Sequence, residues 1–462
     1  MSVPDYFQPN TIYCGDCKEV IGKFPDGSID LIYADPPFFS NRHYEVIWGD
    51  GYELRAFEDR WKGKIEHYIG WMKERLEKCY RVLKPNGSMY LHCDWHASHY
   101  LKVEMDSLFG DKGFINEIVW KRQTAHSDTK QGAKHYGRLH DVILFYTKGN
   151  NYTWNQQYQP YSQEYIEAFY QHVDPITKKR FTLSDLTAAK PGGDTSYEWK
   201  GAKPYKGRYW AYSKENMEKF DKEGKLYYTK TGMPRFKNYL DEMPGVGLQD
   251  VWDDISPAGI GKEAQGYPTQ KPELLLERII NSSSNPMDIL LDPFCGCGTA
   301  IAVAHKRGRR WIGIDVSPTS CNLMEKRMRS LHAQTKVMGM PMLDEDLRKI
   351  PPFEFQNWVI KRLYGRVSTR KTSDMGIDGY TFEGYPVQVK QSDDIGRNVI
   401  DNFETAIRRH KAKKGVIVAF SFGQGAWEEI ARAKNHDDIE IQAISVTELL
   451  SNKDARIETT SD

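Results

Sequence analysis

The stretches Asp30-Leu-Ile-Tyr-Ala-Asp-Pro-Pro-Phe38 and Ile289-Leu-Leu-Asp-Pro-Phe-Cys-Gly-Cys-Gly-Thr299 decide the fold of this chain. Each is a short apolar run that ends abruptly in an Asp-Pro turn. A buried parallel strand ends in this way when it delivers functional groups to the carboxyl edge of an α/β sheet. We therefore expect one strand end to carry a carboxylate and an aromatic ring, and the other to carry a glycine-rich loop.

The glycine-rich loop predicts a nucleotide-like ligand. Gly296 and Gly298 allow the backbone to turn tightly and approach a ligand, and Thr299 opens a helix whose first N–H groups face it. The next predicted strand ends at Asp315, about twenty residues on, where a carboxylate commonly holds the hydroxyls of a ribose. The loop has neither a Walker lysine nor the G-x-G-x-x-G spacing. A cofactor with a ribose and no phosphate, such as S-adenosylmethionine, therefore fits better than ATP or NAD.

Three motifs resemble those of the amino-methyltransferases of DNA. They are Asp-Pro-Pro-Phe at 35–38, Tyr-Pro-Thr-Gln-Lys-Pro at 267–272 and Asp-Pro-Phe-Cys-Gly-Cys-Gly-Thr at 292–299. Their order is similar to that of the β group, which includes the modification subunits of restriction systems. The similarity covers roughly the first three quarters of the chain. It implies an α/β fold with a permuted Rossmann-like sheet, and methyl transfer from S-adenosylmethionine to an exocyclic amine of DNA.

The residues of the first motif suit this chemistry. The lone pair of a base amine is delocalised into the ring, so we expect the Asp35 carboxylate and the Pro36 carbonyl to accept both amino hydrogens and free that lone pair. The base must first leave the duplex. Stacking on Phe38, which follows Pro37, offsets part of the cost of extrusion. The alternative is that Phe38 is a core residue and Asp35 a helix cap.

The resemblance also implies a set of cofactor contacts. They come from an acidic turn near the start of the chain, from the 267–272 motif, and from the glycine-rich loop with the strand that follows it. The expected cofactor-binding residues are Asp16, Thr269, Lys271, Asp292, Phe294, Gly296, Gly298, Thr299 and Asp315. The simpler alternatives are that Asp16 only shapes a turn and that Lys271 is a solvated charge.

The hydrophobic pattern divides the first part of the chain into three segments. Alternating strand and helix periods predict a parallel sheet whose catalytic half spans 1–150 and whose cofactor half spans 266–335. Between them, 151–265 loses these periods and predicts a target recognition region. Within 196–240, eleven basic residues stand against five acidic ones, although the formal net charge of the chain is only +1. This excess predicts phosphate contacts by Lys200, Arg208, Arg235 and Lys237, with an ordinary solvated surface as the alternative.

A smaller α/β domain is predicted at 351–450, after a linker at 336–350 and before a tail at 451–462. Gln388 and Lys390 are two residues apart on a predicted strand and so share a face, and Asp378 precedes them. This pattern resembles the Mrr-like branch of the PD-(D/E)xK restriction nucleases. The resemblance implies a Mg²⁺ site at Asp378 and Gln388, a stabilising Lys390, and Glu354 as a further candidate. A domain that binds DNA without cutting it is the alternative.

The composition is typical of a cytoplasmic multidomain enzyme. The chain has 462 residues, of which 39% are hydrophobic, so it can bury more than one core. No apolar run approaches the ~20 residues of a membrane helix, and no secretory signal is visible. The seven cysteines are expected to be free thiols.

The sequence thus predicts a site-specific DNA methyltransferase of a restriction-modification system with a fused Mg²⁺-dependent endonuclease-like domain. The aspartate at 35 resembles enzymes that modify adenine N6. The expected partners are double-stranded DNA and either a second copy of the chain or a restriction subunit, with no membrane. The alternatives are a cytosine-N4 methyltransferase whose C-terminal domain only binds DNA, and an inactive DNA-binding regulator. The intact Asp35 and the two loop glycines argue against the inactive regulator.

Overall fold

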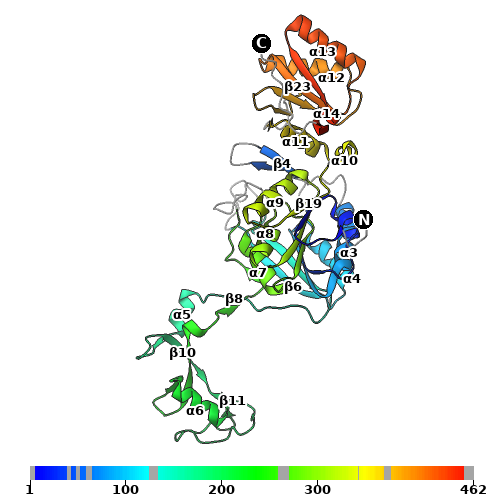
Figure 1. Ribbon diagram of the computed structural model, residues 1–462. Coiled ribbons are helices and arrows are strands. Elements are labelled where there is room, and N and C mark those ends of the chain that lie inside the picture. The colour runs from blue at the N-terminus through cyan, green and yellow to red at the C-terminus, as the bar shows by residue number, and fades with distance from the viewer. Residues whose placement is uncertain are drawn as a thin grey trace. The chain divides into compact units, whose positions relative to one another are not determined.

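The computed structural model describes residues 6–38, 43–47, 53–58, 65–123, 134–258, 270–341, 343–368 and 376–451, with only the backbone at 43–47 and 53–58. The chain folds into two compact units (Figure 1). The larger unit consists of Met1–Asn155 and Asp250–Asp462, and the smaller one is Gln156–Gln249. The smaller unit lies inside the 151–265 segment that the sequence pattern sets apart.

A nine-stranded sheet forms the centre of the larger unit. In spatial order its strands are β16 (Val251–Trp252), β6 (Phe114–Lys121), β7 (His140–Thr147), β5 (Leu83–Cys93), β2 (Ile29–Ala34), β17 (Ile289–Asp292), β18 (Arg310–Asp315), β1 (Thr11–Cys14) and β19 (Lys336–Met338). Early β2 pairs with late β17, with Leu31 opposite Leu290. This adjacency confirms the permuted Rossmann-like sheet.

The sheet is parallel except at β7, which runs antiparallel to both β5 and β6. The prediction of a wholly parallel sheet is therefore wrong at this strand. An antiparallel neighbour can be reached without a helical crossover. The 122–139 segment before β7 has none of the apolar spacing that marks the helical connections elsewhere.

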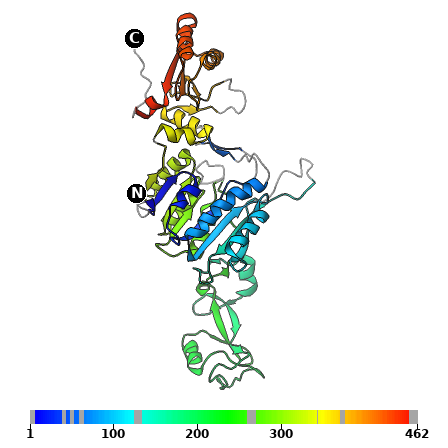
Figure 2. The same ribbon diagram turned by 90° about the vertical axis from the view of Figure 1, so that its right-hand side faces the viewer.

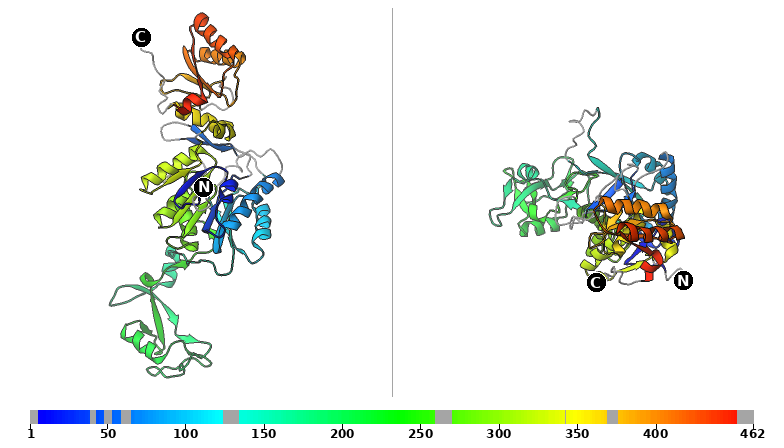
Figure 3. Two further views of the ribbon diagram at one scale, coloured as in Figure 1. Left: turned by 45° about the vertical axis from the view of Figure 1, so that its right-hand side comes forward. Right: turned by 90° about the horizontal axis from the view of Figure 1, so that it is seen from above.

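Helices cover both faces of this sheet (Figure 3). One core contains residues of α2 (Cys17–Gly22), α3 (Ile65–Val82) and α4 (Ser98–Phe109), and the other contains residues of α7 (Glu273–Ser283), α8 (Thr299–Lys306) and α9 (Pro318–Ser330). Along β2, Leu31 and Tyr33 enter one core while Ile32 and Ala34 enter the other. Burial on both faces explains why the strand is a continuous apolar run.

The structure differs from the sequence prediction at 336–350, which we expected to be a linker. β19 pairs in parallel with β1, placing Lys336 opposite Thr11. The helix α10 (Asp344–Lys349) follows, and its Leu347 is buried in a core of the C-terminal domain. A three-residue strand and a six-residue helix are too short to show a hydrophobic period, so the pattern alone does not reveal them.

The C-terminal domain is a small α/β fold. Its five-stranded sheet has the order β20 (Arg366–Val367), β21 (Gly379–Tyr380), β22 (Pro386–Val389), β23 (Lys414–Ala419) and β24 (Glu440–Ser445). One core joins the sheet to α12 (Arg397–Arg409) and α13 (Gln424–Asp437), and another joins it to α10, α11 (Pro352–Arg362) and α14 (Val446–Ser451). The domain is therefore a sheet with helices on both faces.

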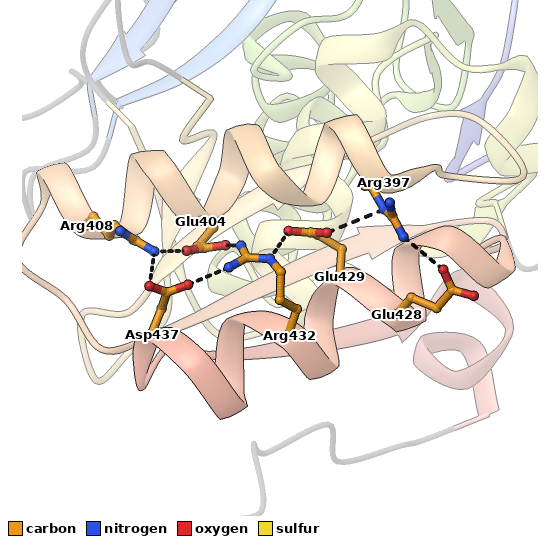
Figure 4. A network of polar contacts seen from close by, with 7 residues as sticks. All are labelled: Arg397, Glu404, Arg408, Glu428, Glu429, Arg432 and Asp437. Atoms are coloured by element: carbon orange, nitrogen blue, oxygen red, sulfur yellow. Dashed lines mark hydrogen bonds and ion pairs between the residues drawn. The ribbon is translucent and has the colours of Figure 1, made fainter.

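An ion-pair network connects α12 to α13 (Figure 4). Glu404 is 2% exposed and pairs with Arg408 and Arg432, and buried Glu429 also pairs with Arg432. Glu404 and Glu429 lie near Asp401 at a spacing that suits a metal ion. Because arginines already neutralise both buried carboxylates, we interpret this cluster as a structural connection between the helices.

The smaller unit is built around a four-stranded antiparallel sheet (Figure 2). Its strands are β13 (Leu226–Tyr228), β14 (Pro234–Tyr239), β10 (Arg180–Asp185) and β9 (His172–Val173). Its other elements are α5 (Gln163–Phe169), α6 (Lys214–Lys222), η2 (Leu240–Glu242) and the pairs β8 (Tyr158–Gln159) with β15 (Val246–Gly247) and β11 (Thr187–Ala188) with β12 (Tyr209–Trp210). Trp199 and Trp210 are buried with Met217 of α6. Part of the aromatic content of this region therefore builds a core and is not available to DNA.

The remaining described strands, β3 (His43–Ile47) and β4 (Glu53–Glu58), form an antiparallel pair. Within the ranges that the structure describes, none of the helices combines the length and apolar character needed to cross a membrane.

The α12–α13 network predicts a stability effect. Glu404→Gln removes one buried charge, and Arg408 and Arg432 each lose one of their ion-pair partners. We therefore expect the melting temperature of the C-terminal domain to fall by at least about 4 °C in scanning calorimetry. Asp438→Asn is the matched control, since the Lys413–Asp438 pair is 78% and 83% exposed and should be dispensable. Equal melting temperatures for the two variants would show that the network does not stabilise the domain.

Candidate active site

Four neighbouring strands bring the predicted site residues to one edge of the large sheet. β2, β17, β18 and β1 pair in parallel, each with the next. Segments that follow parallel strands lie at the same edge. The segments after these strands, which include Asp35, Gly296 and Asp16, line one cavity of about 320 Å³. The structure therefore brings the catalytic motif and the glycine-rich loop together.

The glycine-rich loop depends on two left-handed residues. Gly296 has φ of 52° and Gly298 has φ of 78°, a region that residues with a Cβ rarely adopt. A Cβ on Gly298 would also lie 2.9 Å from Cγ of Met324. Gly298 caps α8, so the N-terminus of that helix lies at the cavity, which Thr299 helps to line.

Asp315 connects the end of β18 to the glycine-rich loop. Its Oδ2 accepts a hydrogen bond from the Gly296 N–H at 2.8 Å, and its Oδ1 accepts one from the Ser317 N–H at 2.8 Å. Burial raises the pKa of Asp315 to about 6, and the two backbone N–H groups oppose that rise. Asp315 is therefore largely ionised at neutral pH and can accept hydrogen bonds from a ligand.

Asp292 ends β17 and lies next to this loop. It is 3% exposed, and its Oδ1 accepts a hydrogen bond from the Phe294 N–H at 3.1 Å. Burial, together with the negative charge of Asp35, raises the pKa of Asp292 to about 8. Asp292 is thus mostly protonated near neutral pH and is a hydrogen-bond donor in the cavity wall.

Asp16 both caps a helix and lines the cavity. It is the N-cap of α2, where its Oδ1 accepts a hydrogen bond from the Lys18 N–H at 2.8 Å, and its Oδ2 pairs with Arg75. Arg75 in turn stacks on Trp71 with its guanidinium 3.7 Å from the ring centroid. Sequence reasoning missed Trp71 and Arg75. Their i and i+4 spacing on α3, beside the apolar stripe, is the signal that marks them.

Asp35 forms an ion pair inside the cavity. Lys271 Nζ lies 2.5 Å from Asp35 Oδ2, and the two side chains are 11% and 17% exposed. Lys271 Nζ also lies 5.3 Å from the centroid of the Phe38 ring. Pro36 is buried, while Pro37 and Phe38 are half-buried and line the cavity. Thr269, which was expected next to Lys271, lies outside the described residues.

A buried hydrogen-bond network lies behind the Asp35 loop. Tyr33 Oη is 2.9 Å from His92 Nδ1, and His92 Nε2 is 3.3 Å from Asp141 Oδ2. A carboxylate can only accept, so His92 Nε2–H donates to Asp141; in the neutral imidazole, Nδ1 then accepts from the Tyr33 hydroxyl. The His92 ring also lies 5.8 Å from the Phe38 ring. These residues come from β2, β5 and β7, and the network contacts the Asp35 loop through the His92 and Phe38 rings.

The chemistry of the cavity fits S-adenosylmethionine. Its walls combine apolar groups such as Trp71 and Phe294 with carboxyl groups, and a side chain at Gly298 would alter the loop that shapes it. Among the described lining residues the cations are Arg75 and Lys271, and each is paired with a carboxylate. A site without an uncommitted cation suits a nucleoside cofactor better than a pyrophosphate.

The four predicted DNA contacts of the smaller unit are all engaged inside that unit. Lys200 pairs with Asp221, Arg208 and Arg235 with Asp185, and Lys237 with Asp174. By contrast, Lys206, Lys214, Lys219, Lys222 and Lys230 have no ion-pair partner within the described part of the unit. These five lysines are therefore better placed to attract phosphate than the four that the sequence pattern selected.

In the C-terminal domain, β21 and β22 bring Asp378 and Gln388 together. Asp378 Oδ2 accepts a hydrogen bond from the Val389 N–H at 2.7 Å, directly beside Gln388. Gln388 is 3% exposed, and its Nε2 donates to the Gly376 carbonyl at 2.8 Å. Its Oε1 is buried without a hydrogen-bond partner in the described structure. Lys390 follows at the end of β22 and is half-buried.

Glu354 does not join this group. It lies on α11, where Gln356 Nε2 donates to the Asp378 carbonyl at 2.9 Å. Residues two apart on a helix lie on different faces, so Glu354 points away from Asp378. Its Oε2 instead accepts a hydrogen bond from Thr319 Oγ1 at 3.4 Å, and burial raises the pKa of Glu354 to about 8. The expectation of Glu354 as a metal-site residue is therefore corrected by the geometry of α11.

Comparison with known proteins gives two family matches. Residues 29–326 match the DNA methylase family, and residues 347–451 match a restriction endonuclease family of the Mrr catalytic type. Among solved structures, the cytosine-N4-specific PvuII DNA methyltransferase matches with a TM-score of 0.38 and 14% identity, covering 71% of this chain and 95% of that one.

Two relatives illustrate the sequence similarity. The type II methyltransferase M.EcaI of Enterobacter cloacae is 33% identical over 303 residues, which cover 64% of this chain and 64% of that protein. The DNA adenine methyltransferase YhdJ of Escherichia coli (strain K12) is 30% identical over 314 residues, covering 67% of this chain and 79% of that protein. The chain thus spans slightly less than two thirds of the length of M.EcaI.

The first family match includes both loops of the cavity, since it contains the Asp-Pro-Pro-Phe motif and the glycine-rich loop. It also extends over more than half of the chain. The chain therefore belongs to the DNA methylase family.

Proposed function

We propose that this protein transfers a methyl group from S-adenosylmethionine to the exocyclic amine of one base in double-stranded DNA, as part of a restriction-modification system. The observation that supports this proposal most strongly is that Asp35 and the Gly296–Gly298 turn line the same cavity. A carboxylate that can hold an amine and a loop that can hold a nucleoside thus share one site. The inactive DNA-binding regulator is disfavoured because both parts are intact.

The residues that would hold the cofactor surround the cavity. When bound, S-adenosylmethionine supplies the methyl group. Asp315 would accept hydrogen bonds from the ribose, and Trp71 and Phe294 would cover the apolar parts of the ligand. Asp16 would accept a hydrogen bond from the adenine amine. The side-chain-free backbone at Gly296 and Gly298 would allow the ligand to approach the start of α8.

Asp35 would prepare the amine for attack. Its carboxylate and the Pro36 carbonyl would accept the two amino hydrogens, so that the nitrogen lone pair points toward the methyl. A carboxylate is too weak a base to deprotonate a neutral base amine, so the proton leaves only after attack has made the nitrogen cationic. Phe38 would stack on the extruded base, a contact worth about 1–3 kcal/mol.

Adenine N6 is the favoured target. The relative YhdJ, of which this chain covers 79%, is an adenine methyltransferase. The aspartate at the start of the catalytic motif also resembles enzymes that act on adenine. Cytosine N4 remains the alternative, because its amine also has two hydrogens for Asp35 and the Pro36 carbonyl to accept.

We also propose that the C-terminal domain cleaves DNA with Mg²⁺. The orphaned Oε1 of buried Gln388 is a suitable oxygen ligand for this ion, and the neighbouring Asp378 carboxylate supplies a charged one. Lys390 would stabilise the negative charge that develops on the phosphate. A domain that binds DNA without cutting it is the alternative.

Asp35→Asn tests the role of the carboxylate. Because the amide has one acceptor oxygen and no charge, we expect methyl transfer to fall by at least about 10²-fold while the cofactor still binds. The readout is the modified positions in DNA from cells that express each variant, which also identifies the base. Asp111→Asn, at an exposed acid, is the control. Wild-type methylation by Asp35→Asn would remove this assignment.

Gly298 at the start of α8 and Gly308 shortly after its end are a matched pair for testing the glycine-rich loop. Gly298 and Gly308 both have left-handed φ, but a Cβ meets Met324 at Gly298 and nothing within 4 Å at Gly308. We expect Gly298→Ala to weaken S-adenosylhomocysteine binding at least about 10-fold in calorimetry, whereas Gly308→Ala loses only stability, by about 1 kcal/mol. If both variants bind the ligand as the wild type does, the loop is not the cofactor site.

Cleavage by the C-terminal domain can be tested separately. Purified protein with Mg²⁺ should cut unmethylated DNA, and Asp378→Ala should cut at least about 10²-fold more slowly because the charged ligand of the ion is lost. Asp401→Ala, which removes an exposed acid of α12, should cut normally. Equal cleavage by Asp378→Ala and the wild type would exclude this site, and no cleavage by any of them would favour the binding-only alternative.

A further inference from the structure

The ion pair between Lys271 and Asp35 occupies the group that the reaction needs. Lys271 Nζ lies 2.5 Å from Asp35 Oδ2, and little of either side chain is exposed to water. In the proposed reaction, the amine of the target base donates one of its two hydrogens to this same carboxylate. While Lys271 holds Asp35, the base therefore competes with a charged donor for this carboxylate.

The other cation of the cavity is fixed in place. Arg75 pairs with Asp16, donates from Nη1 to the Trp71 carbonyl at 2.9 Å and stacks on the Trp71 ring. Lys271 has one ion-pair partner in the described structure, Asp35. Its ammonium group is at the end of a flexible four-carbon side chain. A ligand that carries a carboxylate into this cavity would therefore find Lys271 the more exchangeable cation.

Lys271 also lies between the two loops of the cavity. Its Nζ is 5.3 Å from the centroid of the Phe38 ring on the catalytic side, and Lys271 lines the cavity together with Cys297 and Thr299 of the glycine-rich loop. A rotation of its side chain can therefore move the charge from one loop toward the other without a change in the backbone.

We propose that Lys271 exchanges its ionic partner, leaving Asp35 and pairing with the α-carboxylate of the cofactor when the cofactor binds. The inference rests on the proposed function. One ion pair replaces another, so the exchange needs little net free energy. Its consequence is an order of events: Asp35 becomes available to a base only when a carboxylate-bearing cofactor is in the cavity.

Two ligands separate this exchange from ordinary cofactor binding. S-adenosylhomocysteine carries the α-carboxylate, whereas 5′-methylthioadenosine has the same nucleoside and no carboxylate. Calorimetric dissociation constants would be measured for both ligands with the wild type, Asp35→Asn, Lys271→Met and the double variant. Asp35→Ala repeats the Asp35→Asn measurement in case the amide still holds Lys271.

If Asp35 competes for Lys271, Asp35→Asn should bind S-adenosylhomocysteine about 3- to 10-fold more tightly, and Lys271→Met should bind it at least about 10-fold more weakly. The double variant should match Lys271→Met, because without the lysine there is nothing to release. The affinity for 5′-methylthioadenosine should stay within about twofold throughout, which also shows that every variant is folded.

Three results would overturn the exchange. The first is that both Asp35 variants bind S-adenosylhomocysteine no more tightly than the wild type. The second is that Asp35→Asn increases this affinity equally in the Lys271→Met background. The third is that the affinity for 5′-methylthioadenosine changes in the same way as that for S-adenosylhomocysteine. Failure of the wild type to bind either ligand would instead contradict the proposed function itself, so the two claims fail in different ways.

Discussion

The cavity depends on one constraint: the carboxyl ends of parallel strands lie at the same edge of a sheet. β2 and β17 are more than two hundred residues apart in the chain, yet they are neighbours, so Asp35, which follows β2, and Asp292, which ends β17, lie on adjacent strands. Permuting the order of the segments along the chain does not alter this edge. A catalytic motif near the start and a cofactor loop far downstream can therefore build one cavity.

The electrostatics of the cavity follow from burying several carboxyl groups together. Asp315 keeps its charge near neutral pH because the Gly296 and Ser317 N–H groups donate hydrogen bonds to it. Asp292 is mostly protonated because burial and the negative charge of Asp35 both raise its pKa. Asp35 is compensated by Lys271. The same residue types thus perform different tasks, and the backbone and the neighbouring charges determine which task each one has.

Much of the core and of the site was accessible from sequence because strand ends and glycine turns have local signatures. The continuous apolar run before Asp35 indicates burial on both faces, and the structure agrees. Contacts between distant segments have no such signature. Three sets of contacts depend on which strands become neighbours, and periodicity does not encode that. They are the pairing of Lys271 with Asp35, the Tyr33–His92–Asp141 network, and the ion pairs that Arg235 and Lys237 form with aspartates. Glu354 is a similar case, because the sequence does not show that its side chain on α11 contacts Thr319.

The most direct measurement of the central claim is a crystal structure of the chain with S-adenosylhomocysteine and a DNA duplex that contains its modified site. The account predicts one base outside the helix, its exocyclic nitrogen within about 3 Å of an Asp35 oxygen and its ring against Phe38. It also predicts the ligand on the Gly296–Gly298 turn of the same cavity. A target base that stays paired, or that enters the protein away from Asp35, would contradict it.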